Sequence, residues 1–315
     1  MSDQGGNNFI THIYRGVEGE IIPDNVTRII VDVSVRVISH HAFWEHENIV
    51  EVICHDGVEK IEECAFLDCH SLRRVIMPGV KIIERSAFGS CEALENVECG
   101  KLEIIRHDAF QQCTRLRSIN LPSTRIVEGW AFWDCTALID MKFGSELKLE
   151  RMSMGVFSAC TSLQRITIPL KDGLFDDAGS PFMGCENLVR VDLVEGEVHT
   201  TIAALQLEEW GNDVIEEIES INQILPNADA GYYTVYTDED GDYDDYDEGE
   251  KAQAIRSWIR SVLGKIAHYK AEHERLLIEA AATLQLVLPQ DIAMNNIVPF
   301  LELPVGEVEA DGNDE

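Results

Sequence analysis

Hydrophobic residues recur along the first 195 residues in a fixed phrase, apolar-x-x-x-Ala-Phe-x-x-Cys-x-x-Leu-x-x-Val, where x is any residue. Seven copies follow one another, with phenylalanines separated by 23, 22, 22, 22, 25 and 25 residues: Phe43, Phe66, Phe88, Phe110, Phe132, Phe157 and Phe182. A cysteine stands three residues after every one of these phenylalanines except the first, where His46 takes its place. Self-similarity at a nearly fixed period is the signature of a repeat architecture.

The period limits what each repeat can contain, because about 22 residues are too few for a helix pair and too many for the hexapeptide repeats of a β-helix. The segments Leu72–Met77 and Leu116–Leu121 alternate apolar and polar residues near their ends, which predicts a short strand. The Ala-Phe-x-x-Cys segments place apolar residues three apart, which predicts a helical turn. Since one copy cannot bury its own apolar face, we expect the copies to stack around a continuous core.

The Ala-Phe-x-x-Cys-x-x-Leu phrase resembles the BspA-like, or type 5, class of leucine-rich repeats over Val26–Val194. The resemblance implies a solenoid with a curved parallel sheet, used to recognise proteins or other macromolecules. Members of this family are often found at cell surfaces. The sixth and seventh copies depart from the phrase, because Val156 and Pro181 replace its alanine.

After the repeats, apolar residues are spaced by steps of three and four from Leu207 to Leu225, which predicts an amphipathic helix ending at Pro226. A solenoid must cover its last apolar face, so this helix is interpreted as a cap. An acidic run without any base predicts a solvated linker. Similar steps of three and four from Ile255 to Ala280 predict a second amphipathic helix, which either packs back on the rest of the chain or pairs with another chain.

The predicted fold class is therefore α/β, a leucine-rich-repeat solenoid with short helical turns, followed by α-helical C-terminal segments. The predicted divisions are an N-terminal cap at 1–25, seven repeats at 26–195, a helical cap at 196–228, an acidic linker at 229–250, an amphipathic helix at 251–287 and a C-terminal tail at 288–315.

Charge narrows the range of partners. The chain has 57 Asp and Glu against 25 Lys and Arg, and its net charge of -32 repels phosphate backbones and anionic lipid headgroups alike. We therefore expect no nucleic-acid and no membrane partner. The first residues are polar without a secretory pattern, and no apolar run approaches the roughly 20 residues of a membrane-spanning helix. The expected location is cytoplasmic, with the nucleus as the alternative, and thiols stay reduced in both.

Cysteine and histidine are the residues best able to carry chemistry here. The six cysteines in phase with the repeat are interpreted as a ladder of small buried thiols, because zinc sites need ligands paired close in sequence and Cys64 and Cys69 fit no such motif. His41 and His46 are explained by their repeat positions. No phosphate-binding loop, nucleophile elbow or calcium-binding loop occurs. We therefore expect no catalytic residue, no metal, no cofactor and no enzymatic activity.

The pattern favours a non-catalytic protein-protein interaction module or scaffold that binds through one face of the solenoid. Two alternatives remain open. The tail Leu288–Pro304 distantly resembles the opening of an F-box, which would make the chain a ubiquitin-ligase substrate receptor. An enzyme hidden in the C-terminal helices is the other alternative, although no polar cluster on those helices supports it.

The candidate partner-binding residues follow from the strand phrase. If its valine and its final apolar residue face the core, the residues just before each of them face outward onto the concave surface. These residues are Glu51, Ile53, Arg74, Ile76, Asn96, Glu98, Ser118, Asn120, Asp140, Lys142, Arg165, Thr167, Arg190 and Asp192. Four are basic and four acidic, in a chain where acids greatly outnumber bases. The balance is explained either by a sheet that avoids like-charge neighbours or by a face that must desolvate against a partner.

Overall fold

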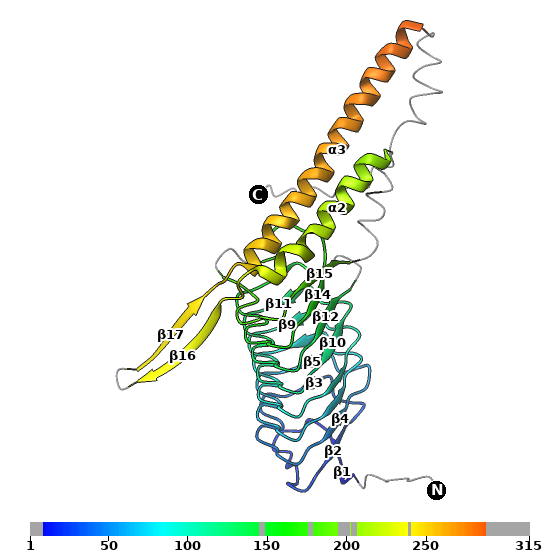
Figure 1. Ribbon diagram of the computed structural model, residues 1–315. Helices are drawn as coiled ribbons and strands as arrows, with labels where there is room; N and C mark the ends of the chain where they lie inside the picture. The colour runs from blue at the N-terminus through cyan, green and yellow to red at the C-terminus, as the bar shows by residue number, and fades with distance from the viewer. Residues whose placement is uncertain are drawn as a thin grey trace, which may run out of the picture. The chain divides into compact units, whose positions relative to one another are not determined.

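The computed structural model describes residues 9–144, 149–175, 179–194, 202, 207–238 and 241–287. Short parallel strands stack along the solenoid, followed in the chain by a helix, a hairpin and a longer helix (Figure 1). The chain forms two compact units, residues 1–195 with 219–259 and residues 196–218 with 260–315. The predicted class, a parallel-sheet solenoid followed by C-terminal helices, is confirmed.

The longer strands of the solenoid lie on one side, one strand per turn, in two parallel sheets that together are called the main face. The first sheet is ordered β1 (Thr11–Tyr14), β2 (Arg28–Val31), β4 (Glu51–Ile53), β6 (Arg74–Ile76) and β8 (Asn96–Glu98). The second sheet is ordered β10 (Ser118–Leu121), β12 (Asp140–Phe143), β14 (Arg165–Ile168) and β15 (Arg190–Leu193). Along each strand side chains alternate between core and solvent, so Val75 is fully buried while Arg74 beside it is exposed.

A third parallel sheet of six strands, which the sequence reasoning did not predict, is built from only two residues per repeat. Its strands are β3 (Val37–Ile38), β5 (Lys60–Ile61), β7 (Ile82–Ile83), β9 (Ile104–Ile105), β11 (Ile126–Val127) and β13 (Arg151–Met152). The second residue of every pair is fully buried. Two residues are too few to show an alternating pattern in the sequence, which explains why this sheet was missed.

The predicted helical turn around each Ala-Phe pair is wrong, because no helix is assigned there in the described repeats. Each segment instead forms two tight turns. Within it, successive backbone N–H groups donate hydrogen bonds alternately to the carbonyl three residues earlier and to a carbonyl of the next repeat. Leu67 N donates to Cys64 O at 3.2 Å, and Phe66 N donates to Ala87 O at 2.8 Å. Apolar residues three apart fit this path as well as a helix, so spacing alone could not distinguish the two.

The core of the solenoid is centred on a ladder of seven phenylalanines, each no more than 1% exposed. Successive rings stack with centroids 4.8 to 5.9 Å apart and planes within 13° of parallel. Tyr14 meets Phe43 edge-on at one end of the ladder, and Phe175 meets Phe182 edge-on at the other. The phenylalanines therefore form the continuous core that the stacking of the copies predicted, and the stack ends on aromatic rings rather than on open space.

Residues 229–250, predicted as an acidic linker, contain an antiparallel hairpin of β16 (Tyr232–Asp238) and β17 (Gly241–Asp247). The register pairs Tyr233 with Tyr246 and Tyr236 with Tyr243. Aromatic residues favour strands, and each strand of the hairpin carries tyrosines among its residues. Charge counting alone therefore missed a strand signal carried by the tyrosines.

Two α-helices complete the described chain: α2 (Glu208–Ile224), followed by the short 3-10 helix η1 (Leu225–Asn227), and α3 (Lys251–Val287). In the second unit, Trp210 stacks on Tyr269, and Lys265 Nζ lies 2.9 Å from Asp213 Oδ1. In this unit α3 packs against α2, so the second amphipathic helix packs on the rest of the chain, which is one of the two alternatives given for it above. Neither helix combines the length and apolar character needed to cross a membrane in the described chain. The F-box-like tail and residues 1–8 lie outside the described residues.

Candidate interaction surface

The fourteen candidate residues lie in two rows across the main face, because successive strands pair in register. One row runs Glu51, Arg74 and Asn96 in the first sheet and Ser118, Asp140, Arg165 and Arg190 in the second. The other runs Ile53, Ile76 and Glu98, then Asn120, Lys142, Thr167 and Asp192. All are exposed or half-buried except Glu51, which is 7% exposed.

Glu51 is covered because it lies between two arginines from neighbouring strands. Arg28 Nε is 2.6 Å from its Oε2, and Arg74 Nη1 is 3.3 Å from its Oε1. Arg74 also reaches Glu98 at 2.7 Å. The alternating charges thus form a continuous network across four strands, β2 to β8.

A second network crosses the other sheet of the main face. Arg165 Nη2 lies 3.3 Å from Asp140 Oδ2, and Arg165 Nε lies 3.6 Å from Asp192 Oδ2. Arg190 Nε pairs with Asp192 at 2.9 Å. The acidic and basic side chains of this face therefore pair with one another within the sheet. Such pairing is expected because like charges on adjacent strands are unfavourable.

The sequence reasoning missed two strands that extend the rows toward the N-terminus. Arg28 pairs in register with Glu51, and Ile13, Ile30, Ile53 and Ile76 follow one another in register across β1, β2, β4 and β6. Ile13 is 44% exposed and Ile30 is 38% exposed. The signal was present in the run of β-branched residues Ile29–Val31 at one period before β4, although no Ala-Phe phrase accompanies it.

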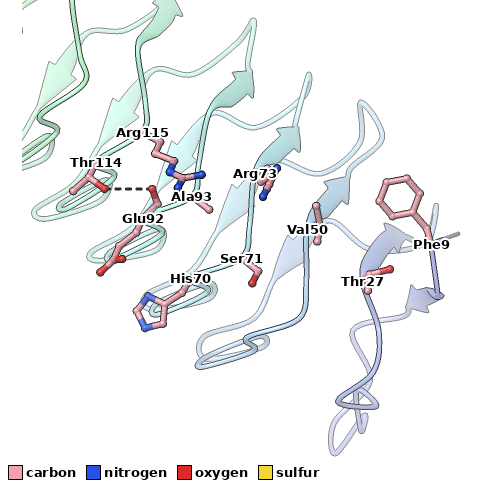
Figure 2. Close-up of a pocket in the computed structure, with 10 residues that line it drawn as sticks. All are labelled: Phe9, Thr27, Val50, His70, Ser71, Arg73, Glu92, Ala93, Thr114 and Arg115. Atoms are coloured by element: carbon pink, nitrogen blue, oxygen red, sulfur yellow. Dashed lines mark hydrogen bonds between the residues drawn. The ribbon is translucent and has the colours of Figure 1, made fainter. Parts of the chain in front are cut away.

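Two hollows lie on or beside the main face. A depression of about 400 Å³ lies on the face itself, between Ser118, Asn120, Asp140 and Lys142. A larger groove of about 720 Å³ follows the residues that precede the strands, and Figure 2 shows its lining side chains on successive turns from Phe9 to Arg115. Both hollows open to solvent.

The six laddered cysteines lie behind the phenylalanines, and each thiol donates a hydrogen bond to the carbonyl of the phenylalanine one repeat earlier. The Sγ to O distances run from 3.0 Å for Cys69 to 3.3 Å for Cys113. Burial raises the pKa of Cys69 and Cys185 to about 12. Thiols held protonated in this way are poor nucleophiles and poor metal ligands. No group of three or more His, Cys, Asp or Glu side chains is arranged to hold a metal in the described part of the chain.

A stack of parallel strands around a buried aromatic ladder defines a repeat solenoid, and the sequence comparisons identify its kind. The model of the BspA type leucine-rich repeat region matches residues 23–139 and 81–202, with six copies. These matches cover more than half of the chain, so the chain belongs to the BspA-type leucine-rich repeat family. No curated protein sequence matches the chain.

Solved structures resemble the chain at low identity. A leucine-rich repeat protein of T. pallidum is 22% identical with a TM-score of 0.46, covering 58% of this chain and 84% of that one. The pneumococcal vaccine antigen PcpA is 21% identical with a TM-score of 0.40, covering 57% and 54%. A leucine-rich repeat protein from Bacteroides ovatus is 21% identical with a TM-score of 0.27, covering 53% and 61%.

Proposed function

We propose that the chain is a non-catalytic protein-protein interaction module that binds a partner protein through the main face. Membership of a leucine-rich repeat family supports the general role of an interaction module. The observation that carries the proposal is the alignment of solvent-facing side chains in two rows that cross successive strands in register. Such rows form an extended, preordered surface, which is the usual binding surface of solenoid proteins.

Asn120 is the best position at which to test this face. It lines the depression on the face, its side chain is exposed, and it makes no side-chain hydrogen bond among the described residues. The arginines are poorer choices, because changing them would break the ion-pair networks described above. Replacing Asn120 therefore changes the surface with little effect on folding, by roughly 0.5 kcal/mol or less.

The experiment places the photoreactive amino acid p-benzoylphenylalanine at Asn120 and exposes the chain to an extract of its source cells under light. We expect discrete cross-linked proteins that disappear when excess unlabelled chain competes. The control places the same amino acid at His107, an exposed residue that follows β9 on the other side of the same repeat. Equal cross-linking at both positions, or none at Asn120, would rule out the main face as the binding surface.

A further inference from the structure

The groove beside the main face has its own chemistry. Its floor is formed by the residues that immediately precede the strands, including Thr27, Val50 and Arg73. A neighbouring hollow shares Arg115 with it and adds Glu95 and Arg117. The two hollows together therefore reach from β2 to β10, beside five consecutive strands of the main face.

The two hollows share Arg115 and are treated together as one groove, in which two arginines differ from most others of the solenoid. Neither Arg73 nor Arg117 forms an ion pair within the described residues, and Arg115 comes no closer than 3.9 Å to Glu95. By contrast, six other arginines pair with carboxylates, four of them on the main face and two beside the third sheet: Arg28, Arg74, Arg165, Arg190, Arg106 and Arg125. The chain has 57 Asp and Glu against 25 Lys and Arg, so most basic side chains can find a carboxylate nearby. The guanidinium groups of Arg73 and Arg117 are therefore available to a carboxylate from a partner.

The spacing of these two arginines along the stacked strands suits an extended peptide. Adjacent strands lie about 4.8 Å apart, so Arg73 and Arg117, which precede strands two places apart, are separated by roughly 10 Å along the groove. A peptide in the extended polyproline II conformation advances about 3.1 Å per residue and returns to the same face every three residues, so this distance corresponds to roughly three residues on one face. The whole groove, four strand intervals long, spans roughly 19 Å and accommodates roughly six residues.

The far end of the groove is apolar and held in place. The ring of Phe9 lies 3.6 Å below the guanidinium carbon of Arg28, which is itself fixed by its ion pair with Glu51. Val50 lines the groove beside it and is half-buried. A cation over an aromatic face is attractive, so this contact favours the position of the ring at the groove.

We infer that this groove binds an extended acidic peptide segment of a partner protein. Two carboxylates about three residues apart pair with Arg73 and Arg117, and an apolar side chain of the peptide packs on Phe9 and Val50. Arginine suits this role because its planar guanidinium donates paired hydrogen bonds to a carboxylate. The inference rests on the proposed function, since it names the chemistry of the partner.

A peptide fits the groove better than a nucleic acid or an anionic lipid surface. Glu92 and Glu95 stand between the arginines along the groove, so positive charge is discontinuous. A peptide can place neutral residues opposite these carboxylates, whereas a phosphate backbone carries a charge at every nucleotide. The net charge of -32 also opposes any densely anionic partner.

The test measures fluorescence anisotropy of the full chain with a labelled synthetic peptide that carries one phenylalanine and two glutamates three residues apart. We expect the peptide to bind, and to bind more weakly as salt rises because its contacts are partly exposed. The double variant Arg73→Gln/Arg117→Gln should raise Kd by at least about tenfold, because both charge-assisted contacts are lost. A peptide with glutamine in place of both glutamates should bind the unmodified chain at least about tenfold more weakly for the same reason.

The matched control is the double variant Arg15→Gln/Arg151→Gln. It removes the same charge from two exposed arginines that also form no ion pair in the described residues but lie outside the groove. We expect its Kd to stay within about twofold of the unmodified chain, because only the long-range field changes and salt screens it. An equal loss in both double variants would overturn the inference, since the attraction would then come from overall charge.

Two further results would also overturn the inference. One is equally tight binding of the glutamine peptide. The other is binding of an oligothymidine or of phosphatidylserine vesicles that depends on Arg73 and Arg117 while the acidic peptide does not bind. Cross-linking from Asn120 separates this failure from failure of the proposed function: cross-links that persist when the acidic peptide fails to bind would leave the main face intact as a binding surface.

Discussion

The cysteine in each repeat has a role that its size alone does not explain. Burial was predictable, because free cysteine behaves as a small hydrophobe, but alanine or valine would satisfy that requirement equally well. The structure adds the hydrogen bond from each thiol to the phenylalanine carbonyl of the preceding repeat. His46, in the cysteine position of the first copy, places Nε2 3.4 Å from Ile22 O and so makes a similar contact. A one-dimensional pattern cannot reveal this acceptor, because it lies a full repeat away.

Thiol accessibility gives a prediction at this scale. Of the nine cysteines, only Cys64 is partly exposed, and the other eight are buried. Burial raises the pKa of Cys54 and Cys99 to about 12, so almost no reactive thiolate forms there near neutral pH. We expect iodoacetamide at about pH 8 to modify Cys64 first in the folded chain, as measured by peptide mass spectrometry.

The control for this labelling is the same reaction in denaturant, where all nine cysteines should react at similar rates. Cys64→Ser should abolish the early modification without exposing any other thiol. Labelling of Cys91 or Cys113 in the folded chain as fast as Cys64 would show that the cysteine ladder opens readily. The laddered thiols would then not be protected by burial.

The turn segment is the element that sequence reasoning predicted least well. Residues on both sides of the Ala-Phe pair adopt left-handed backbone angles, with φ of 58° at Asp108 and 57° at Gln112. Most of these positions are not glycine, so the usual sequence signal for a left-handed residue is missing. The strands of the main face were predictable from their alternation, whereas the turns depend on backbone bonds between repeats that no local pattern encodes.

Ala159 gives a direct test of this geometry, because its φ is 59° and the next repeat carries Gly184 at the same position. Alanine is strained in a left-handed conformation by roughly 1 kcal/mol, whereas glycine is not. Part of that gain is offset by the greater freedom of glycine in the unfolded chain. We expect Ala159→Gly to leave the free energy of unfolding unchanged or to raise it by up to about 1 kcal/mol in urea denaturation.

The matched variant is Ala87→Gly, at a buried alanine that precedes Phe88 and has no left-handed angle. This change removes a buried methyl group and adds backbone freedom, so it should lower the free energy of unfolding by roughly 1 to 2 kcal/mol. Equal destabilisation by the two substitutions would contradict the left-handed assignment at Ala159.

For the whole molecule, the stacking of repeats was predictable, but the ways in which the stack begins and ends were not. The first unit adds β1 and β2 before the first full copy, and its last strand is closed by residues far along the chain. Asn222 Oδ1 accepts a hydrogen bond from Val191 N at 3.0 Å, and Gly184 N donates to Ala230 O at 3.1 Å. Such closing contacts are made once rather than in every repeat, so no periodicity in the sequence signals them.

Lys251 is the most unusual of these closing residues, because its side chain is only 2% exposed. Its Nζ donates to Leu188 O at 2.6 Å, to Leu225 O at 3.2 Å and to Glu186 O at 3.3 Å. Burial lowers the pKa of Lys251, so the ammonium group is retained at a cost and its three carbonyl partners offset that cost. A single side chain thereby joins the last repeat to the 3-10 helix η1 within the first unit.

Replacing Lys251 with methionine should therefore loosen the end of the solenoid more than its middle. Methionine fills a similar volume but leaves the carbonyl oxygens of Glu186, Leu188 and Leu225 without this donor, which we expect to cost roughly 2 to 3 kcal/mol. Solenoid repeats contact mainly their neighbours, so the effect should be concentrated in the last repeat. Hydrogen exchange followed by mass spectrometry should show faster exchange in β15 and unchanged exchange in β6.

The control Lys171→Met alters an exposed lysine of the same solenoid and should leave both strands unaffected. Uniformly faster exchange along all strands would instead show that the solenoid unfolds as one cooperative unit, with Lys251 contributing to its global stability.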